Sequence, residues 1–137
     1  MSSEDLLGGA GTAMPETTGF ELDQLTVVLL HEGPRYSDYS PEQAQALANE
    51  HLAYTVGLVT DGHLLHAGAL VDERSGPRFT GLGISRLSPA QLAPLIQRDP
   101  SVAAGLEDFR IVTHVFPKGS VDFQVERETA LSPRASY

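Results

Sequence analysis

The sequence predicts an α+β fold with the ferredoxin-like strand and helix order βαββαβ, and three observations lead to this class. Apolar runs typical of buried or half-buried strands occur four times, at residues 25–31, 63–71, 78–85 and 106–116. Two stretches with helical periodicity separate the first run from the second and the third from the fourth. Each stretch opens with a Ser-Pro pair, Ser40-Pro41 or Ser88-Pro89, which is favoured at helix starts.

The composition is that of one soluble globular domain. The chain has 137 residues, of which 41% are hydrophobic and 20% charged, so it is long enough to bury a core. Nine basic against 18 acidic residues give a net charge of −9, which argues against nucleic acid or an anionic membrane as a partner. The absence of cysteine excludes disulfides and zinc–thiolate sites. Without a signal sequence or an apolar run long enough to span a membrane, we expect a cytoplasmic protein.

The two ends differ from the middle of the chain. Met1–Gly19 is rich in small and polar residues and is expected to be a flexible tail, because it can bury little apolar surface. The folded domain is expected at 20–117. Residues 118–137 would form a C-terminal extension, in which Val121–Val125 has the composition of an edge strand.

The first strand and the first helix have clear limits. Leu25–His31 is a leucine and β-branched run, as in a strand covered on both faces. The helix after it runs from Ser40 to Gly62, with Ser40 as N-cap, Gln43 completing a capping box, and Gly62 placed for a left-handed C-terminal cap. His51 lies at its centre, on the stripe of residues that face the core.

The remaining elements follow at short spacing. The third strand, 78–85, contains Gly81 and Gly83 on one face, where missing side chains leave room for a backbone, a ligand or a large neighbour. The second helix begins after Ser88 and ends at Asp99, because a residue before proline is pushed out of the helical region. The fourth strand follows at 106–116.

This order predicts a four-stranded antiparallel sheet with both helices on one face, since β-α-β crossovers are right-handed. The opposite face would keep apolar side chains and the two glycines. A second copy of the same sheet is the simplest cover for that face, so we expect a twofold homodimer.

Two residues carry the chemical hypotheses, and the residues alone leave alternatives open for both. His51 fits a buried neutral imidazole with a satisfied hydrogen bond, or a general acid–base group that titrates near neutrality. Asp99 fits an ordinary N-cap for the turn after it, or a carboxylate that orients the His51 ring. At the C-terminal end of a helix its charge is disfavoured by the helix dipole, and an adjacent imidazolium would relieve this conflict.

The other histidines give little support to a metal site. His63 and His66 are three residues apart in a strand, so they point to opposite faces and do not easily bind one metal. His31 and His114 lie near strand ends, and a site assembled from separate strands is the weaker alternative. We expect neither a metal nor another cofactor.

The segments LLHEGPRY, NEHLAYTVGLVTDGHLLHAGALVD and RDPSVAAGL, followed by a strand ending in Phe116-Pro117, resemble in order and spacing the YCII-related domain family. The likeness runs from about Leu25 to Pro117. It implies a dimeric α+β barrel built on the ferredoxin-like arrangement. This sequence departs from the family pattern at two places. It has Gly68-Ala69 where the family commonly has Gly-Pro, and Phe116 where the family often has Trp. Both changes affect the pocket wall.

The resemblance implies a small enzyme in which His51 and Asp99 form a catalytic pair that transfers protons on a small organic substrate. Lyase, isomerase, cyclase and dehydrohalogenase chemistry all fit, in secondary metabolism or aromatic catabolism. No cysteine and no Gly-x-Ser-x-Gly elbow supplies a nucleophile. Arg35, Tyr36 and His114 are candidate substrate-binding residues. The alternatives are a non-catalytic dimeric module that binds a small molecule in the same cleft, and a structural dimer in which His51 is a core residue.

Overall fold

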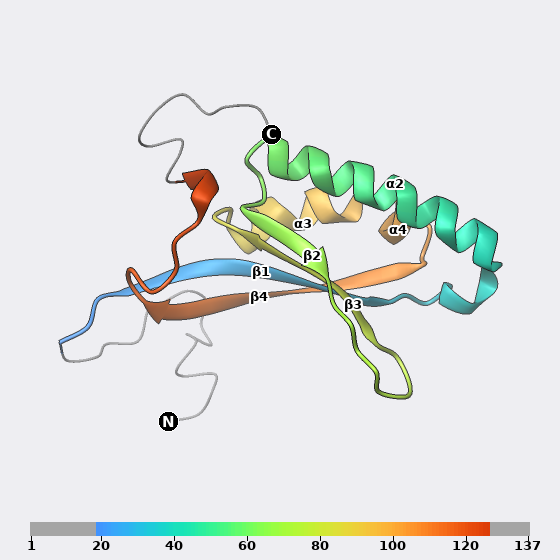
Figure 1. Cartoon of the computed structure of the whole chain (residues 1–137), viewed down its shortest axis with the longest axis horizontal. Helices are drawn as coiled ribbons and strands as arrows, with labels where there is room; N and C mark the ends of the chain where they lie inside the picture. The colour runs from blue at the N-terminus through green and yellow to red at the C-terminus, as the bar shows by residue number, and fades with distance from the viewer. Residues whose placement is uncertain (1–18, 127–137) are drawn as a thin grey trace. The chain divides into compact units, whose positions relative to one another are not determined.

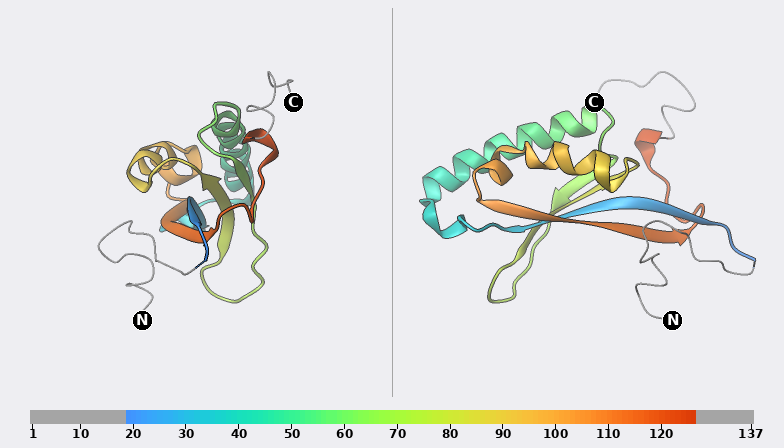
Figure 2. Two further views of the ribbon diagram at one scale, coloured as in Figure 1. Left: turned by 90° about the vertical axis from the view of Figure 1, so that its left-hand side faces the viewer. Right: turned by 180° about the vertical axis from the view of Figure 1, so that it is seen from behind.

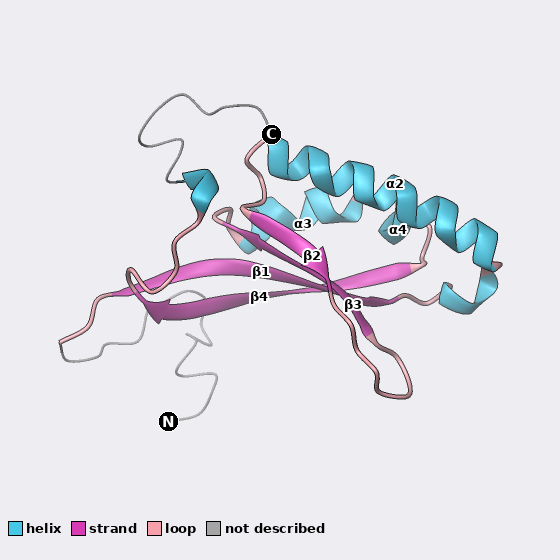
Figure 3. Ribbon diagram, in the orientation of Figure 1, coloured by secondary structure: helices cyan, strands magenta, loops and turns pink. Residues whose placement is uncertain are grey.

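The computed structural model describes residues 19–126, and its elements follow the predicted order (Figures 1 and 3). The tail predicted at Met1–Gly19, except for its last residue, and the extension from residue 127 onward lie outside the described residues. The elements are β1 (Leu22–Glu32), the 3-10 turn η1 (Tyr36–Asp38), α2 (Pro41–Thr60), β2 (His66–Ala69), β3 (Phe79–Ser85), α3 (Pro89–Gln97), α4 (Pro100–Ala103) and β4 (Glu107–Pro117).

The described chain divides into two compact units. The larger, Thr26–Val112, contains every helix of the core and the candidate site. The smaller consists of residues 19–25 and 113–126. In it the Lys118 N–H donates a hydrogen bond of 2.9 Å to the Glu21 carbonyl, so the chain segments on either side of the larger unit are joined to each other.

The four strands form one sheet in the order β2-β3-β1-β4, and β3 is antiparallel to both β1 and β2. Helices α2, α3 and α4 all lie on one side of this sheet, and the turn between β2 and β3 projects to the other side (Figures 1 and 2). This is the ferredoxin-like α+β arrangement, and the predicted fold class is confirmed.

Helix α2 begins and ends where the sequence predicted. The Ser40 hydroxyl accepts the Gln43 N–H at 3.1 Å and the Gln43 side chain accepts the Ser40 N–H at 2.9 Å, so the capping box is complete. Gly62 has φ +82°, the left-handed value that ends the helix. These caps fix the helix so that His51 and Leu58, seven residues apart, share its inward face.

The second helical segment is interrupted at Asp99. Helix α3 ends at Gln97, and Asp99 has φ −58° and ψ 129°, the extended conformation expected of a residue before proline. Helix α4 starts at Pro100, and the Asp99 Oδ1 atom accepts the Ser101 N–H at 2.9 Å as its N-cap. The interruption therefore places a carboxylate at the junction of α3 and α4.

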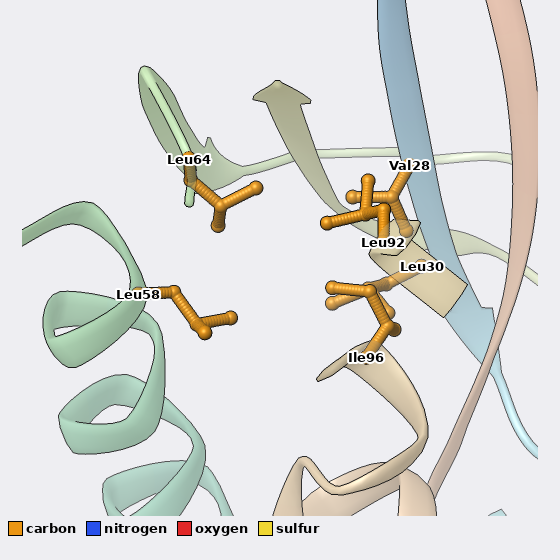
Figure 4. Close-up of a cluster of buried hydrophobic side chains, with 6 residues drawn as sticks. All are labelled: Val28, Leu30, Leu58, Leu64, Leu92 and Ile96. Atoms are coloured by element: carbon orange, nitrogen blue, oxygen red, sulfur yellow. The ribbon is translucent and has the colours of Figure 1, made fainter. Parts of the chain in front are cut away.

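The core lies between the helices and the sheet (Figure 4). It is built from aliphatic side chains contributed by β1, α2, α3 and the segment before β2. Burial of each such side chain stabilises the fold by about 1.5–3 kcal/mol. The members are Val28, Leu30, Leu58, Leu64, Leu92 and Ile96.

The prediction for the face of the two glycines was wrong. Gly81 pairs with Leu30 and Gly83 pairs with Val28, so both glycines share the helix-covered side with these buried residues. A Cβ at residue 83 would lie 2.8 Å from Val28 Cγ1. The missing side chains make room beneath the helices, not on the open face of the sheet.

The predicted strands differ in extent from the structure, and two of the differences have a visible cause. No strand forms at Val121–Val125 within the described part of the extension, and residue 124 begins a helical turn. The chain turns first, because Gly119 has φ +86° and the Ser120 N–H bonds to the Pro117 carbonyl at 3.1 Å. Strand β2 covers His66–Ala69 instead of 63–71, and it starts late because the His63 N–H still bonds to the last turn of α2.

Gly33 supports a first test, because it lies where β1 leaves the sheet beside the start of β4. A Cβ there would lie 2.7 Å from the backbone carbonyl carbon of Glu107. We expect Gly33→Ala to lower the free energy of unfolding by about 1–3 kcal/mol, the cost of overpacking. In Gly57→Ala, inside α2 with open space around the new atom, the free energy should rise by about 0.5–1 kcal/mol. Urea unfolding of both variants tests this, and equal stabilities would contradict it.

Candidate active site

A cavity of about 520 Å³ lies between the inward face of α2 and the helix-covered side of the sheet. Its volume is in the range of small-molecule sites. Most of its wall is aliphatic, and its polar groups include His51, Asp99, Glu107 and Thr80. The wall is contributed by Val28, Leu30, Tyr36, Pro41, Ala44, Gln45, Ala48, His51, Leu52, Thr55, Leu58, Leu64, Ala67, Gly68, Ala69, Thr80, Gly81, Leu82, Gly83, Ile96, Asp99, Leu106 and Glu107.

Small residues line the cavity on both its sheet side and its helix side. In the register of β2 and β3, Ala67 pairs with Gly83 and Ala69 pairs with Gly81. On the helix side, α2 presents Ala44 and Ala48. Larger side chains at these positions would fill the space, so the pattern of small residues leaves a site instead of a closed core.

His51 and Asp99 meet at this cavity, as the sequence analysis proposed. The His51 Nδ1 atom lies 2.5 Å from Asp99 Oδ2. The Asp99 side chain is 5% exposed and the His51 side chain 25%, so the carboxylate is enclosed while the ring opens to the cavity. Both interpretations of Asp99 therefore hold at once, because Oδ1 caps α4 and Oδ2 binds the imidazole.

The hydrogen bond to Asp99 raises the pKa of His51 above its ordinary value of 6.5, because the carboxylate stabilises the protonated ring. Partial burial acts in the opposite direction. With Nδ1 bound to Asp99, the other ring nitrogen is the one that can act on a ligand. Among residues 19–126, none forms a hydrogen bond with His51 Nε2.

Two tyrosines hold α2 against the segment that carries Asp99. The Tyr54 hydroxyl, one turn after His51, donates to the Leu95 carbonyl at 2.6 Å. The Tyr39 hydroxyl, just before α2, donates to the Ala104 carbonyl at 2.5 Å. These bonds lie on either side of the His51–Asp99 contact, so the separation of the two helical segments is fixed from both directions.

Three polar residues of the site were not predicted. The Ser101 hydroxyl is fully buried and lies 2.9 Å from Asp99 Oδ1 and 2.6 Å from Glu107 Oε1. The Thr80 hydroxyl donates to Glu107 Oε2, and Glu107 Oε1 is 3.9 Å from His51 Nδ1.

The sequence holds a weak signal for two of these three residues. Ser101 stands two positions after Asp99, and Glu107 opens a strand whose odd-numbered residues Phe109 and Ile111 face the core. The sequence gives no signal for Thr80, because a bulge in β3 determines the side of the sheet on which this residue lies. Leu30 pairs with Gly81 but His31 pairs with Phe79, so residue 80 is the extra one.

The predicted substrate-binding residues are placed differently from one another. Tyr36 lines the cavity at its exposed side. Arg35 is not among the lining residues described. It forms an exposed ion pair of 3.2 Å with Asp38, and its guanidinium lies 5.3 Å from the centre of the Tyr39 ring. His114 belongs to the smaller unit, where its ring stacks on Phe116. Their roles in binding stay predictions.

No group of three or more His, Asp or Glu side chains among residues 19–126 is arranged to hold a metal ion. Helices long and apolar enough to cross a membrane are likewise absent from that part of the chain.

No family model matches this sequence, and no curated protein matches it. Among solved structures, it is similar to the 5-chloro-2-hydroxyhydroquinone dehydrochlorinase of Burkholderia phenoliruptrix AC1100, in complex with 2,5-dihydroxybenzoquinone. That similarity has 14% identity and a TM-score of 0.43, over 66% of this chain and 90% of the other. The de novo designed protein Ferredog-Diesel is similar at 12% identity and a TM-score of 0.42, over 73% of this chain and 94% of the other.

The pKa of His51 gives a second test. In Asp99→Asn the pKa of His51 should fall, because the neutral amide no longer stabilises the imidazolium. Since the wild-type pKa is raised, the pair stabilises the fold fully below pH 6.5, and this contribution is lost as pH rises through the folded-state pKa. NMR titration of the ring protons measures the pKa, and urea unfolding across the same pH range measures the stability. His63 and His66 are internal controls, and an unchanged His51 midpoint would contradict the assigned cause.

Proposed function

We propose that this protein is a small enzyme that uses His51, oriented by Asp99, to transfer protons on a small organic substrate held in the cavity. The single observation that carries the proposal is the buried carboxylate that binds one nitrogen of an imidazole whose ring lines an apolar cavity. Such a carboxylate fixes the tautomer of the ring and favours its protonated form. A ring arranged in this way can accept a proton at Nε2 and return it.

Nucleophilic catalysis through Ser101 fits the geometry poorly. In a Ser-His-Asp triad the serine and the aspartate bind opposite nitrogens of the ring. Here Ser101 lies beside Asp99 on the Nδ1 side, 3.5 Å from that atom, and is fully buried. Its hydroxyl also lies within hydrogen-bond distance of the carboxyl groups of Asp99 and Glu107. Proton transfer is therefore favoured over an acyl-enzyme mechanism.

The reaction class that suits this site is that of a lyase, isomerase or cyclase without a redox cofactor. An aliphatic wall with polar groups gathered around one histidine suits a substrate with an apolar body and few polar atoms. Secondary metabolism and aromatic catabolism are the settings in which we place such a substrate. The second candidate is a module that binds the same kind of molecule without chemistry, since the cavity alone supports binding.

Membership of the YCII-related family belongs to the same proposal and is supported by the ordered segments from Leu25 to Pro117 and by the fold. A cytoplasmic location, and the lack of nucleic acid or membrane partners, stay predictions from charge and composition. Arg35, Tyr36 and His114 stay predicted ligand contacts, with Tyr36 best placed because it lines the cavity.

A ligand screen tests the function. We expect small hydroxylated aromatic compounds to raise the melting temperature of the wild type. Hits are then incubated with protein in D₂O, where NMR detects deuterium at ligand carbons. His51→Gln should abolish this exchange, because this variant lacks the proton acceptor. Asp99→Asn should slow it at least tenfold, because this variant lacks the carboxylate that orients the ring.

Leu52→Ala is the matched control, since this residue lines the cavity without a titratable group. It should weaken binding and leave exchange in the bound complex intact. Binding by the wild type without any exchange would favour the binding module. Exchange at the wild-type rate in His51→Gln would remove His51 from the mechanism.

The homodimer is a further part of the proposal. The side chains of Val27, Leu29 and Ile84 alternate with helix-facing neighbours, so they lie on the face that the helices leave open. Each is only half-buried, and Val112 is exposed. A second copy would cover this apolar face.

Light scattering at micromolar concentration should return twice the chain mass. Val112→Lys should shift the protein toward monomer, because a charge would be buried in the interface. Val56→Lys, on α2 and therefore on the opposite side of the sheet, should not. A monomer mass for the wild type would exclude the dimer.

A further inference from the structure

Glu107 is an acidic residue of the cavity to which proton transfer by His51 alone gives no role. Its side chain is 12% exposed, and it lines the cavity together with His51. The Thr80 hydroxyl donates to Oε2, while the Ser101 hydroxyl lies 2.6 Å from Oε1. His51, whose Nδ1 atom is directed to Asp99, is the one basic side chain within 4 Å of Glu107 in the described chain.

Ser101 stands between two carboxyl groups with a single hydroxyl hydrogen. Its oxygen is 2.9 Å from Asp99 Oδ1 and 2.6 Å from Glu107 Oε1. The single hydroxyl hydrogen of Ser101 can be donated to only one of these two carboxyl oxygens. The other contact then needs a hydrogen on the carboxyl oxygen, because two lone pairs would otherwise face each other.

The second hydrogen belongs on Glu107 rather than on Asp99. Asp99 has donors at both oxygens, since Oδ1 accepts the Ser101 N–H and Oδ2 binds the His51 ring. These are the contacts of an ionised carboxylate. A protonated Glu107 can donate to the Ser101 oxygen, and Ser101 can then donate to Asp99, so every contact of the chain is satisfied.

Electrostatics favour the same arrangement. Two ionised carboxylates joined by one buried hydroxyl repel each other, and a site of this kind holds one of them neutral. Even a protonated His51 would balance only one negative charge, and the hydrogen bond of 2.5 Å assigns that charge to Asp99. In the neutral form that accepts a proton at Nε2, His51 balances neither carboxylate.

We propose that Glu107 is the proton donor of this site and that it acts with His51, the proton acceptor, on the same bound molecule. This inference rests on the proposed function and narrows its reaction class. The His51 Nε2 atom takes a proton from a ligand carbon, and the electron pair of that C–H bond forms a new C=C bond. The neighbouring C–O bond breaks with its electron pair on oxygen. This oxygen replaces the Ser101 oxygen as acceptor of the Glu107 proton and leaves as water or an alcohol.

The substrate class follows from this balance. The ligand carries an acidic C–H bond next to a carbon that bears a hydroxyl or ether oxygen, on an otherwise apolar body. The net reaction is an elimination, and neither an oxidant nor a reductant takes part. The reverse reaction, addition of water or an alcohol, uses the same two residues with their roles exchanged.

The test needs no substrate, because the proton on Glu107 is measured in the free protein. Protein labelled with ¹³C at glutamate Cδ is titrated by NMR, and the Glu107 resonance is identified as the one missing in Glu107→Gln. We expect this resonance at the position of a carboxylic acid at pH values where the exposed glutamates give carboxylate resonances. A carboxylate position there overturns the proposal.

A second measurement uses the His51 ring as the detector. Gln has the shape and the neutral charge of a protonated Glu, so Glu107→Gln should leave the His51 titration midpoint unchanged, while Asp99→Asn lowers it. An ionised Glu107, 3.9 Å away, would raise the pKa of His51, and its replacement would lower the midpoint. A midpoint that falls in Glu107→Gln therefore also overturns the proposal.

Thr80→Val is the matched control, because it removes the other hydroxyl contact of Glu107 and leaves Ser101 in place. It should change neither result. If Glu107 proves ionised while His51→Gln still abolishes ligand exchange, the proton-donor role fails and the proposed function stands. If Glu107 is protonated and no ligand exchanges, the function fails and the assignment of the proton stands.

Discussion

The hydrogen bond between His51 Nδ1 and Asp99 Oδ2 is the interaction on which the rest of the site depends. It joins the middle of α2 to the junction of α3 and α4, two segments 48 residues apart in the chain. The carboxylate is available there because Pro100 ends the helical conformation at Asp99. A continuous helix would give Asp99 no cap to form and would place its side chain differently. One proline thus decides where the acid of the pair stands.

The cavity beside this pair is formed where small residues leave space between the sheet and α2. On the sheet side of the cavity, Gly83 and Gly81 pair with Ala67 and Ala69, so this part of the wall carries only small residues. Large aliphatic side chains close the same layer beside it, and some of them, among them Leu58, also form part of the cavity wall. A core and a binding site are therefore built on one sheet face and share several side chains. The polar cluster of His51, Asp99, Glu107 and Thr80 lies in the wall of this cavity.

The polar cluster also shows how far local sequence signals extend. Capping boxes at Ser40 and Ser88 involve residues three positions apart, so the limits of both helices follow from the sequence. Asp99 was recognisable as a cap and, through the family resemblance, as a partner of His51. Glu107 and Thr80 come from different strands, and their meeting depends on the order of the strands and on a bulge in β3. The spacing of residues within a single strand or helix therefore does not predict the contact between Glu107 and Thr80.

By itself the sequence determined the order of elements, their caps, the fold class and His51 with Asp99 as candidates, because periodicity, capping and proline effects act over a few residues. Tertiary structure decided that Gly81 and Gly83 face the helices, that a cavity lies above them, and that Ser101 and Glu107 join the pair. Register and packing set these features, and both depend on contacts between distant segments. His51 and Asp99 were thus predictable as candidates, whereas the network of acids and hydroxyls around them emerged only when the sheet and the helices came together.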